Sequence, residues 1–198
     1  MRLLFLALSW AVLQITVAEN ECPAKWMTFD RPQGRWCVRV FFGVYTRDVS
    51  QVQCAKHHAV LTGIQTDEER LQIADAGRAE FISANPNAHE LGDAAIWLGA
   101  QRKPACTRNG LCAAKDVFTW TDGFTNGTAG FSFAPGEPEI AWAPAWGGLE
   151  SCLQQFVFYS GRTHPRWPGF PHGSLADNWC TQTVKPLSRL FACGKRPE

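Results

Sequence analysis

Alternating apolar and polar positions near the start of the chain predict a β-hairpin. Residues 22–42 carry β-prone side chains such as Trp36 and Val40, and Pro32-Gln33-Gly34 supplies a turn between two extended segments. The pattern then becomes helical over residues 46–58. This part of the chain therefore predicts a hairpin followed by a helix.

A second helix is predicted after a capping box. The hydroxyl of Thr66 can accept from the backbone N–H three residues later, where Glu69 can reach back. Asn85-Pro86 ends the helix, because proline disfavours helical backbone in the residue before it. The helix that the capping box opens carries apolar residues at roughly helical spacing: Leu71, Ala74, Phe81 and Ile82.

After Gly92 the pattern changes to short apolar runs separated by long stretches rich in glycine, proline and tryptophan. The runs predict strands at Ile96–Gly99, Phe118–Trp120, Leu153–Tyr159 and Arg189–Cys193. Irregular loops this long are uncommon in a compact domain unless they have a function. The sequence therefore predicts an α+β domain with long ordered loops.

The first residues are typical of a secretory signal peptide. Arg2 is followed by an apolar run, Leu3–Val17, and Thr16-Val17-Ala18 offers small residues for cleavage. The prediction is a signal peptide over residues 1–18 and one domain over 19–198, secreted and extracellular. The run is short and interrupted for a membrane span, although a retained anchor is the alternative. No later segment is apolar enough to span a bilayer.

Charge and composition exclude several classes of function. The formal net charge is +1, and removal of Arg2 with the leader leaves 18 basic and 18 acidic residues. A neutral chain has no basic field for nucleic acid. No set of catalytic residues can be assembled, so an enzyme is not expected. Nine tryptophans fit either a Trp-built core or an aromatic binding surface.

Eight cysteines in a chain directed to an oxidising compartment predict four disulfides. Spacing alone leaves 105 pairings open.

A series of motifs in this order resembles the C-type lectin-like family, from Cys22 to Gly194. The resemblance is carried by Cys22-Pro-x-x-Trp26, Cys37, Cys54, Ala59-Val60-Leu61-Thr62-Gly63-Ile64, Ile96-Trp97-Leu98-Gly99, Trp120-Thr-Asp122-Gly123, Glu137-Pro138, Cys152, Cys180 and Cys193. It implies the long form of that fold, with two helices and short antiparallel strands. It also implies buried positions for Trp97 and Trp120, and the pairs Cys22–Cys37, Cys54–Cys193, Cys152–Cys180 and Cys106–Cys112.

The resemblance also implies one calcium site on the long loop. Sugar-binding members hold the ion with carboxylate and amide oxygens, which suit a hard cation. This chain keeps Glu137, Glu150 and Asp177, while Glu139 and Ala176 replace the two amides of the family pattern. The predicted metal and ligand residues are therefore Glu137, Glu139, Glu150 and Asp177, with plain solvated loop charges as the alternative for Glu137 and Glu139.

The lost amides weaken the case for simple sugars. In the family arrangement each sugar hydroxyl donates to a carboxylate and accepts from an amide. An ionised carboxylate only accepts, and alanine does neither. A cation can still bind, whereas mannose or galactose would find no donor.

Two insertions beside this site carry aromatic residues. Trp142, Trp146 and Trp167 either contact a ligand, since indole stacks on sugar faces, or pin their own loops to the domain. Asn126-Gly127-Thr128 is a glycosylation sequon, so we expect Asn126 at the surface.

The sequence thus supports a secreted recognition domain for a glycan or glycoprotein, with a degenerate calcium site. The alternative is a calcium-independent domain that binds a protein or another surface through its Trp-rich loops. Oligomeric state is not indicated.

Overall fold

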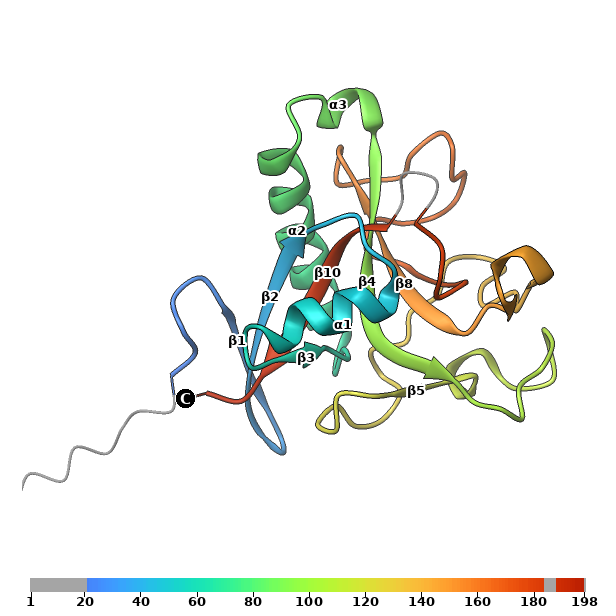
Figure 1. Ribbon diagram of the computed structural model, residues 1–198, viewed down its shortest axis with the longest axis horizontal. Coiled ribbons are helices and arrows are strands. Elements are labelled where there is room, and N and C mark those ends of the chain that lie inside the picture. Colours follow the sequence, from blue (N-terminus) through green and yellow to red (C-terminus); the bar gives the residue numbers. More distant parts are fainter. Residues whose placement is uncertain (1–20, 184–187, 198) are drawn as a thin grey trace, which may run out of the picture.

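The computed structural model describes residues 21–183 and 188–197, so the predicted leader, Met1–Ala18, lies outside the described residues. The elements are β1 (Met27–Arg31), β2 (Gly34–Phe42), α1 (Arg47–Ala55), β3 (Val60–Leu61), α2 (Asp67–Ala84), α3 (Ala88–Leu91), β4 (Asp93–Arg102), β5 (Phe118–Trp120), β6 (Trp142–Ala143), β7 (Gly148–Leu149), β8 (Cys152–Phe158), β9 (Leu175–Asn178) and β10 (Ser188–Lys195) (Figure 1). Short 3₁₀ turns cover Ala114–Asp116 and Pro144–Trp146. The predicted α+β class is confirmed.

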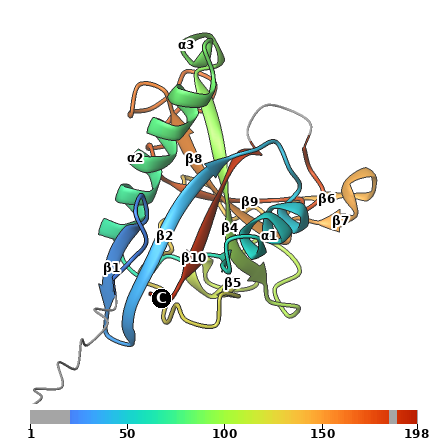
Figure 2. The same ribbon diagram turned by 60° about the vertical axis from the view of Figure 1, so that its left-hand side comes forward.

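The strands of the main sheet follow the order β1-β2-β10-β4-β8-β9, and β3 and β5 pair with β10 and β4 (Figure 2). Strand β10 pairs parallel with β4 and antiparallel with β2. The last strand of the chain is therefore central in the sheet. A separate two-stranded sheet joins β6 to β7 and lies at the far end from β1.

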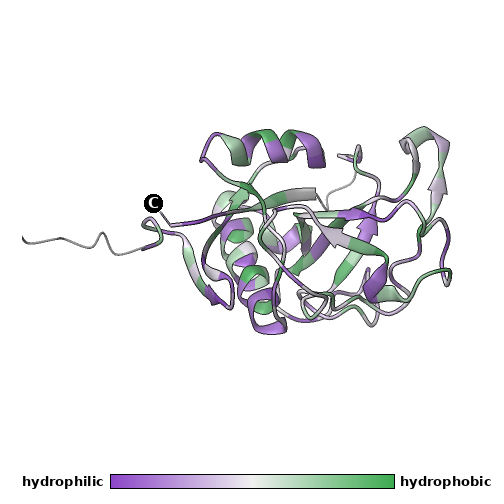
Figure 3. Cartoon of the chain, turned by 90° about the horizontal axis from the view of Figure 1, so that it is seen from below, coloured by the Kyte–Doolittle hydropathy of each residue, from purple (hydrophilic) through white to green (hydrophobic). Residues whose placement is uncertain are grey.

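The two long helices cover opposite faces of the sheet. One buried cluster lies under α1 and includes Cys54, Trp97, Phe191 and Cys193. The larger cluster lies under α2 and includes Ile73, Phe81, Ile96, Leu98 and Leu190. Figure 3, which looks nearly along α2, shows the strands between the two helices.

Helix α2 begins and ends as predicted. Thr66 caps the helix by accepting from the Glu69 N–H. Of the apolar residues at helical spacing, Ala74 and Phe81 are fully buried, whereas Leu71 and Ile82 are 42% and 37% exposed. The helix also buries Glu69 and Arg70 beside Ile73, because Glu69 forms an ion pair in the interior.

All four implied disulfides are present: Cys22–Cys37, Cys54–Cys193, Cys106–Cys112 and Cys152–Cys180. Cys54–Cys193 joins α1 to β10 across 139 positions of sequence. Cys152–Cys180 ties the start of β8 to the segment that follows β9. None of the eight cysteines is left free.

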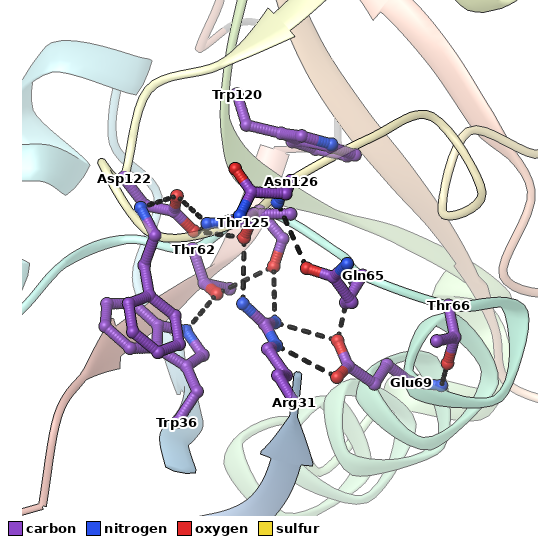
Figure 4. A network of polar contacts seen from close by, with 12 residues as sticks. Arg31, Trp36, Thr62, Gln65, Thr66, Glu69, Trp120, Asp122, Thr125 and Asn126 are labelled. Atoms are coloured by element: carbon purple, nitrogen blue, oxygen red, sulfur yellow. Dashed lines mark hydrogen bonds and ion pairs between the residues drawn. The ribbon is translucent and has the colours of Figure 1, made fainter. Parts of the chain in front are cut away.

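A buried polar network locks the β1–β2 hairpin to α2 (Figure 4). The Arg31 guanidinium donates to both carboxylate oxygens of Glu69, at 2.9 and 2.7 Å, and to the hydroxyl of Thr125 at 2.9 Å. Asp122 accepts from the N–H groups of Gly63 and Thr125, so the Trp-x-Asp-Gly element joins the same network.

Of the two tryptophans implied as core, Trp97 is fully buried and Trp120 is not. Trp120 is half-buried: it stacks on Phe131 with ring centroids 4.1 Å apart, and its indole N–H donates to the Gly127 carbonyl.

A loop segment runs along the outer edge of β9. The N–H of Leu175 donates to Ser132, and the N–H of Ala134 donates to Leu175. Phe133 and Leu175 form a parallel bridge between these bonds. The segment that leads to Glu137 is thereby fixed against the sheet. No helix of the described residues is long and apolar enough to cross a membrane.

Candidate functional site

The loop of residues 137–141 is held against β9 by one carboxylate. The Glu137–Pro138 peptide is cis. Both oxygens of Asp177 accept from the following backbone, one from the Glu139 N–H at 3.0 Å and one from the Ile140 N–H at 2.8 Å. Asp177 is buried, whereas the side chain of Glu139 is exposed.

A second carboxylate joins this loop to the β6–β7 hairpin. The buried Glu150 accepts from the Ala141 N–H at 2.9 Å, and its own N–H donates to the Ala141 carbonyl. Trp142 follows Ala141 directly and pairs with Leu149. The carboxylate set and the tryptophan hairpin are therefore one connected structure.

Three of the four predicted acidic residues come together. Burial first, then a hydrogen bond and charge repulsion from Asp177, raise the pKa of Glu137 to about 9. Burial and the charge of Asp177 raise the pKa of Glu150 to about 8. Glu139 adds a smaller repulsion to both. The repulsion between these carboxylates is therefore relieved when one of them takes up a proton or when a cation binds between them.

The carboxylate oxygens of these residues are the kind of ligand that calcium prefers, although the side chains do not converge on one point. Among the described residues, no three Asp, Glu, His or Cys side chains are placed to hold a metal ion as they stand. The Oε2 atom of Glu137 is buried without a hydrogen-bond partner. A carboxylate oxygen that accepts one N–H keeps a second lone pair, so Asp177 and Glu150 can still act as oxygen ligands.

Neither neighbour of Asp177 supplies the missing amide. Ala176 is buried in an apolar cluster with Phe156 and Phe158. The Asn178 amide donates to Gln154 Oε1 at 2.9 Å on that same face of the strand. Adjacent strand residues point to opposite faces, which places both away from Asp177. Asparagine at position 176 would thus bury an amide among aromatic rings.

The three candidate tryptophans occupy different environments. Trp142 is 67% exposed at the end of the hairpin. Trp146 is half-buried and lies 6.5 Å from the ring of Trp179, whose indole N–H donates to Gly148. Trp179 is not among the site residues that the sequence predicts. Its position just before Cys180 indicates proximity to the site, since the Cys152–Cys180 disulfide places it beside Cys152 and hence near Glu150.

Trp167 packs its own loop. Its indole N–H donates to the buried Asp93 at 2.8 Å, and its ring contacts Phe156 and Phe170 at 5.1 and 5.8 Å. Arg166 donates to the same carboxylate. The loop of residues 161–173 therefore covers the outer face of β8, and Trp167 anchors it.

Asn126 lies at the surface, on the loop that joins the Arg31 network. Its N–H donates to Gln65 Oε1, which leaves the side chain exposed. Its glycosylation stays a prediction.

Residues 28–190 match the model of a protein family, C-type lectin domain-containing protein 141/158. No curated protein sequence matches the chain. The fold is similar to the cow C-type carbohydrate-recognition domain of CD23, solved in the presence of a GlcNAc2Man3 oligosaccharide (TM-score 0.54, 18% identity, 90% of this chain and 98% of that chain).

It is also similar to a calcium-independent type II antifreeze protein (TM-score 0.52, 19% identity, 90% and 96% covered). Human lithostathine is a third similar structure (TM-score 0.52, 17% identity, 90% and 93% covered). At these identities the likeness establishes the shared fold, whereas ligands differ among proteins of one fold.

Proposed function

The chain belongs to the C-type lectin domain family, and we propose that it is an extracellular domain that binds glycans through Trp142 and the carboxylates beside it. Four disulfides support an oxidising compartment. The proposal includes no catalytic residues. Its ligands are the glycans of free polysaccharides or glycoproteins.

The observation that carries this proposal is the bond between Glu150 and Ala141. It places an exposed indole one residue from a loop that two carboxylates, Asp177 and Glu150, hold. Indole offers a flat apolar face to the C–H side of a sugar ring, and carboxylates accept from its hydroxyls. The two halves of a sugar-binding surface are thus adjacent.

Calcium would be held by Glu137, Glu150 and Asp177, with Glu139 free to turn inward because it is exposed. When bound, the ion offers open coordination positions to sugar hydroxyls. The carboxylates themselves accept hydrogen bonds from the sugar hydroxyls and orient the sugar ring against Trp142. The acceptor-only set predicts weak binding of mannose and galactose.

Trp142→Ala is expected to weaken glycan binding at least tenfold with little change in melting temperature, because the ring is exposed. The measurement is a glycan array with and without EDTA, followed by titration of the best glycan. Tyr159→Ala, an exposed aromatic on another loop, is the control and should bind normally. An unchanged affinity for the Trp142 variant would remove the indole from the site.

Calcium and protons are expected to compete at the carboxylates. Both raised pKa values mean that the folded state binds protons more tightly than the unfolded state, where these groups titrate near 4.5. Without calcium, their contribution to stability therefore falls as pH rises from about 4.5 to about 9. The melting temperature should fall between pH 7 and 9, a range in which His172, whose pKa burial lowers, stays neutral.

Millimolar calcium should reverse that fall, since an ion at 100 times its dissociation constant stabilises the fold by about 2.7 kcal/mol. Glu137→Gln should flatten the pH dependence and remove most of the calcium response. A melting curve of the wild type that calcium leaves unchanged at pH 8 would refute the calcium site but not the tryptophan surface.

The second candidate function is calcium-independent binding to a protein or another surface through the same tryptophans. It is favoured by the absence of a ready three-ligand set among the described residues. Binding on the array that survives EDTA, or a partner captured without glycan, would support this alternative.

A further inference from the structure

One histidine closes the end of the 161–173 loop against β8. Backbone pairing between β8 and the chain before β9 reaches Gly173, whose N–H donates to the Phe156 carbonyl at 2.9 Å. Two residues further along β8, the N–H of Phe158 donates to the Nδ1 atom of His172 at 3.1 Å. Both partners are buried, with Phe158 fully enclosed and His172 9% exposed. The imidazole thus serves as the acceptor for a buried backbone donor.

This bond fixes the protonation state of His172. A ring nitrogen that accepts an N–H carries no proton, so the imidazole is neutral and its hydrogen is on Nε2. A proton on Nδ1 would turn that atom into a donor and leave the Phe158 N–H without an acceptor. A buried backbone N–H without a partner is strongly disfavoured. The closed loop is therefore compatible only with the neutral ring.

The charged groups of α2 that face this ring act in opposite directions. The Asp75 carboxylate lies 3.4 Å from Nε2, but its side chain is 71% exposed, so solvent weakens its attraction for an imidazolium. Burial has the largest effect on the pKa of His172; Asp75 opposes it, and Arg78 and Arg70 add repulsion. The net effect lowers the pKa, which means that the closed loop favours the neutral ring.

On its other sides the ring meets β8 and its own loop. The Phe158 ring lies 6.3 Å from the imidazole and carries no charge. His164 stacks on the same Phe158 ring at 6.0 Å and would add a second positive charge in acid. Neither neighbour stabilises an imidazolium at position 172.

The middle of the loop has a separate anchor. Trp167 and Arg166 both donate to the buried Asp93. Residues 168–173 continue from that anchor toward β9, and His172 lies near their far end. Its bond to β8 therefore closes this segment.

We propose that His172 is a pH-sensitive switch, and that its protonation releases residues 168–173 from β8. In the released segment, water accepts from the Phe158 N–H and surrounds the imidazolium. Release also uncovers the rings of Phe156 and Phe158, which are 2% and 0% exposed when the loop is closed. The domain therefore presents an apolar face on β8 in weak acid. This inference rests on neither glycan nor calcium binding.

Proton linkage gives the direction and the size of the effect. The released histidine titrates at an ordinary pKa of about 6.5, whereas the closed one titrates lower. Closure is therefore fully favoured above about pH 6.5 and weakens as the pH falls below that value. While the closed ring stays neutral, the released population rises about tenfold from pH 7.5 to pH 5.5.

The test is hydrogen exchange of single amides, measured in EDTA at pH 7.5 and pH 5.5 and corrected for the intrinsic rate. Protection of the Phe158 and Gly173 amides should fall about tenfold in acid, because local opening exposes both. The Tyr159 amide donates to Gly92, on the β4 side of β8, and should keep its protection. An equal loss at Tyr159 would mean that the sheet itself loosens, and would overturn the proposal. Unchanged protection at Phe158 would do the same, since protonated His172 would then pair with Asp75 inside the closed loop.

His172→Asn places an amide oxygen near the position of Nδ1 and does not take up a proton in this range. Its Phe158 protection should be the same at both pH values. The matched control is His164→Asn, the other histidine of the loop, which should keep the tenfold response of the wild type. A response that disappears in the His164 variant and persists in the His172 variant would contradict the assignment.

The wild type alone decides the case if His172→Asn leaves the loop open at both pH values. Nitrogen-15 NMR of the imidazole at pH 7.5 should show the hydrogen on Nε2 and none on Nδ1. A ring that becomes positively charged while the Phe158 amide stays protected would refute the proposal.

Discussion

Replacing Cys54 and Cys193 together with alanine should lower the free energy of unfolding by about 5 kcal/mol, because the bridge closes a loop of 139 residues. In the chain-entropy model, the entropy that the unfolded chain regains when the bridge is removed grows with the length of the loop. Stabilities of single domains are roughly 5–15 kcal/mol, so the variant should be partly unfolded at 37 °C. Urea unfolding followed by tryptophan fluorescence measures the change.

Cys106→Ala/Cys112→Ala is the matched control. Its loop spans six positions, which corresponds to about 2 kcal/mol in the same model. If the two double variants lose equal stability, loop length is not what makes Cys54–Cys193 important.

Arg31→Met should destabilise the fold by about 3–5 kcal/mol, because it leaves the buried carboxylate of Glu69 without its cation. It also removes the donors to Thr125 and Gly63, so the hairpin, α2 and the 121–127 loop lose a common partner. The urea midpoint should fall while the slope of the transition stays constant.

The exposed pair of Arg35 with Asp30 on the same hairpin is the control, and Arg35→Met should cost about 1 kcal/mol or less. Arg31→Met/Glu69→Leu should recover part of the loss, since no charge is then buried alone. A single variant as stable as the wild type would mean that water reaches Glu69 in solution.

Local signals in the sequence located most elements correctly. Thr66 caps α2 and Asn85-Pro86 ends it, because both act within a few residues. The disulfide pairs followed from the resemblance and are confirmed. Spacing alone does not indicate which residues α2 buries. Glu69 is buried while Leu71 is exposed, because Glu69 pairs with Arg31, which lies 38 positions away.

The sequence offers candidate site residues but not their arrangement. Asp177 raises the pKa of both Glu137 and Glu150, yet no three acidic side chains of the described residues are placed to hold a metal ion. The sequence also could not separate Trp142 from Trp167. Their difference depends on Asp93, 74 positions before Trp167, which gives one indole a buried acceptor. Trp142 has no such anchor, and its exposure follows from the hairpin alone.

The segment along β9 has a consequence for self-association. An open outer strand presents unpaired N–H and C=O groups that a second chain can extend into a continuous sheet. Ser132 and Ala134 already use those groups of Leu175. That end of the sheet is closed to strand addition, so the domain can present an exposed Trp142 without an adhesive strand beside it. The opposite edge, β1, is five residues long and carries the exposed Asp30, and short charged edges resist such growth.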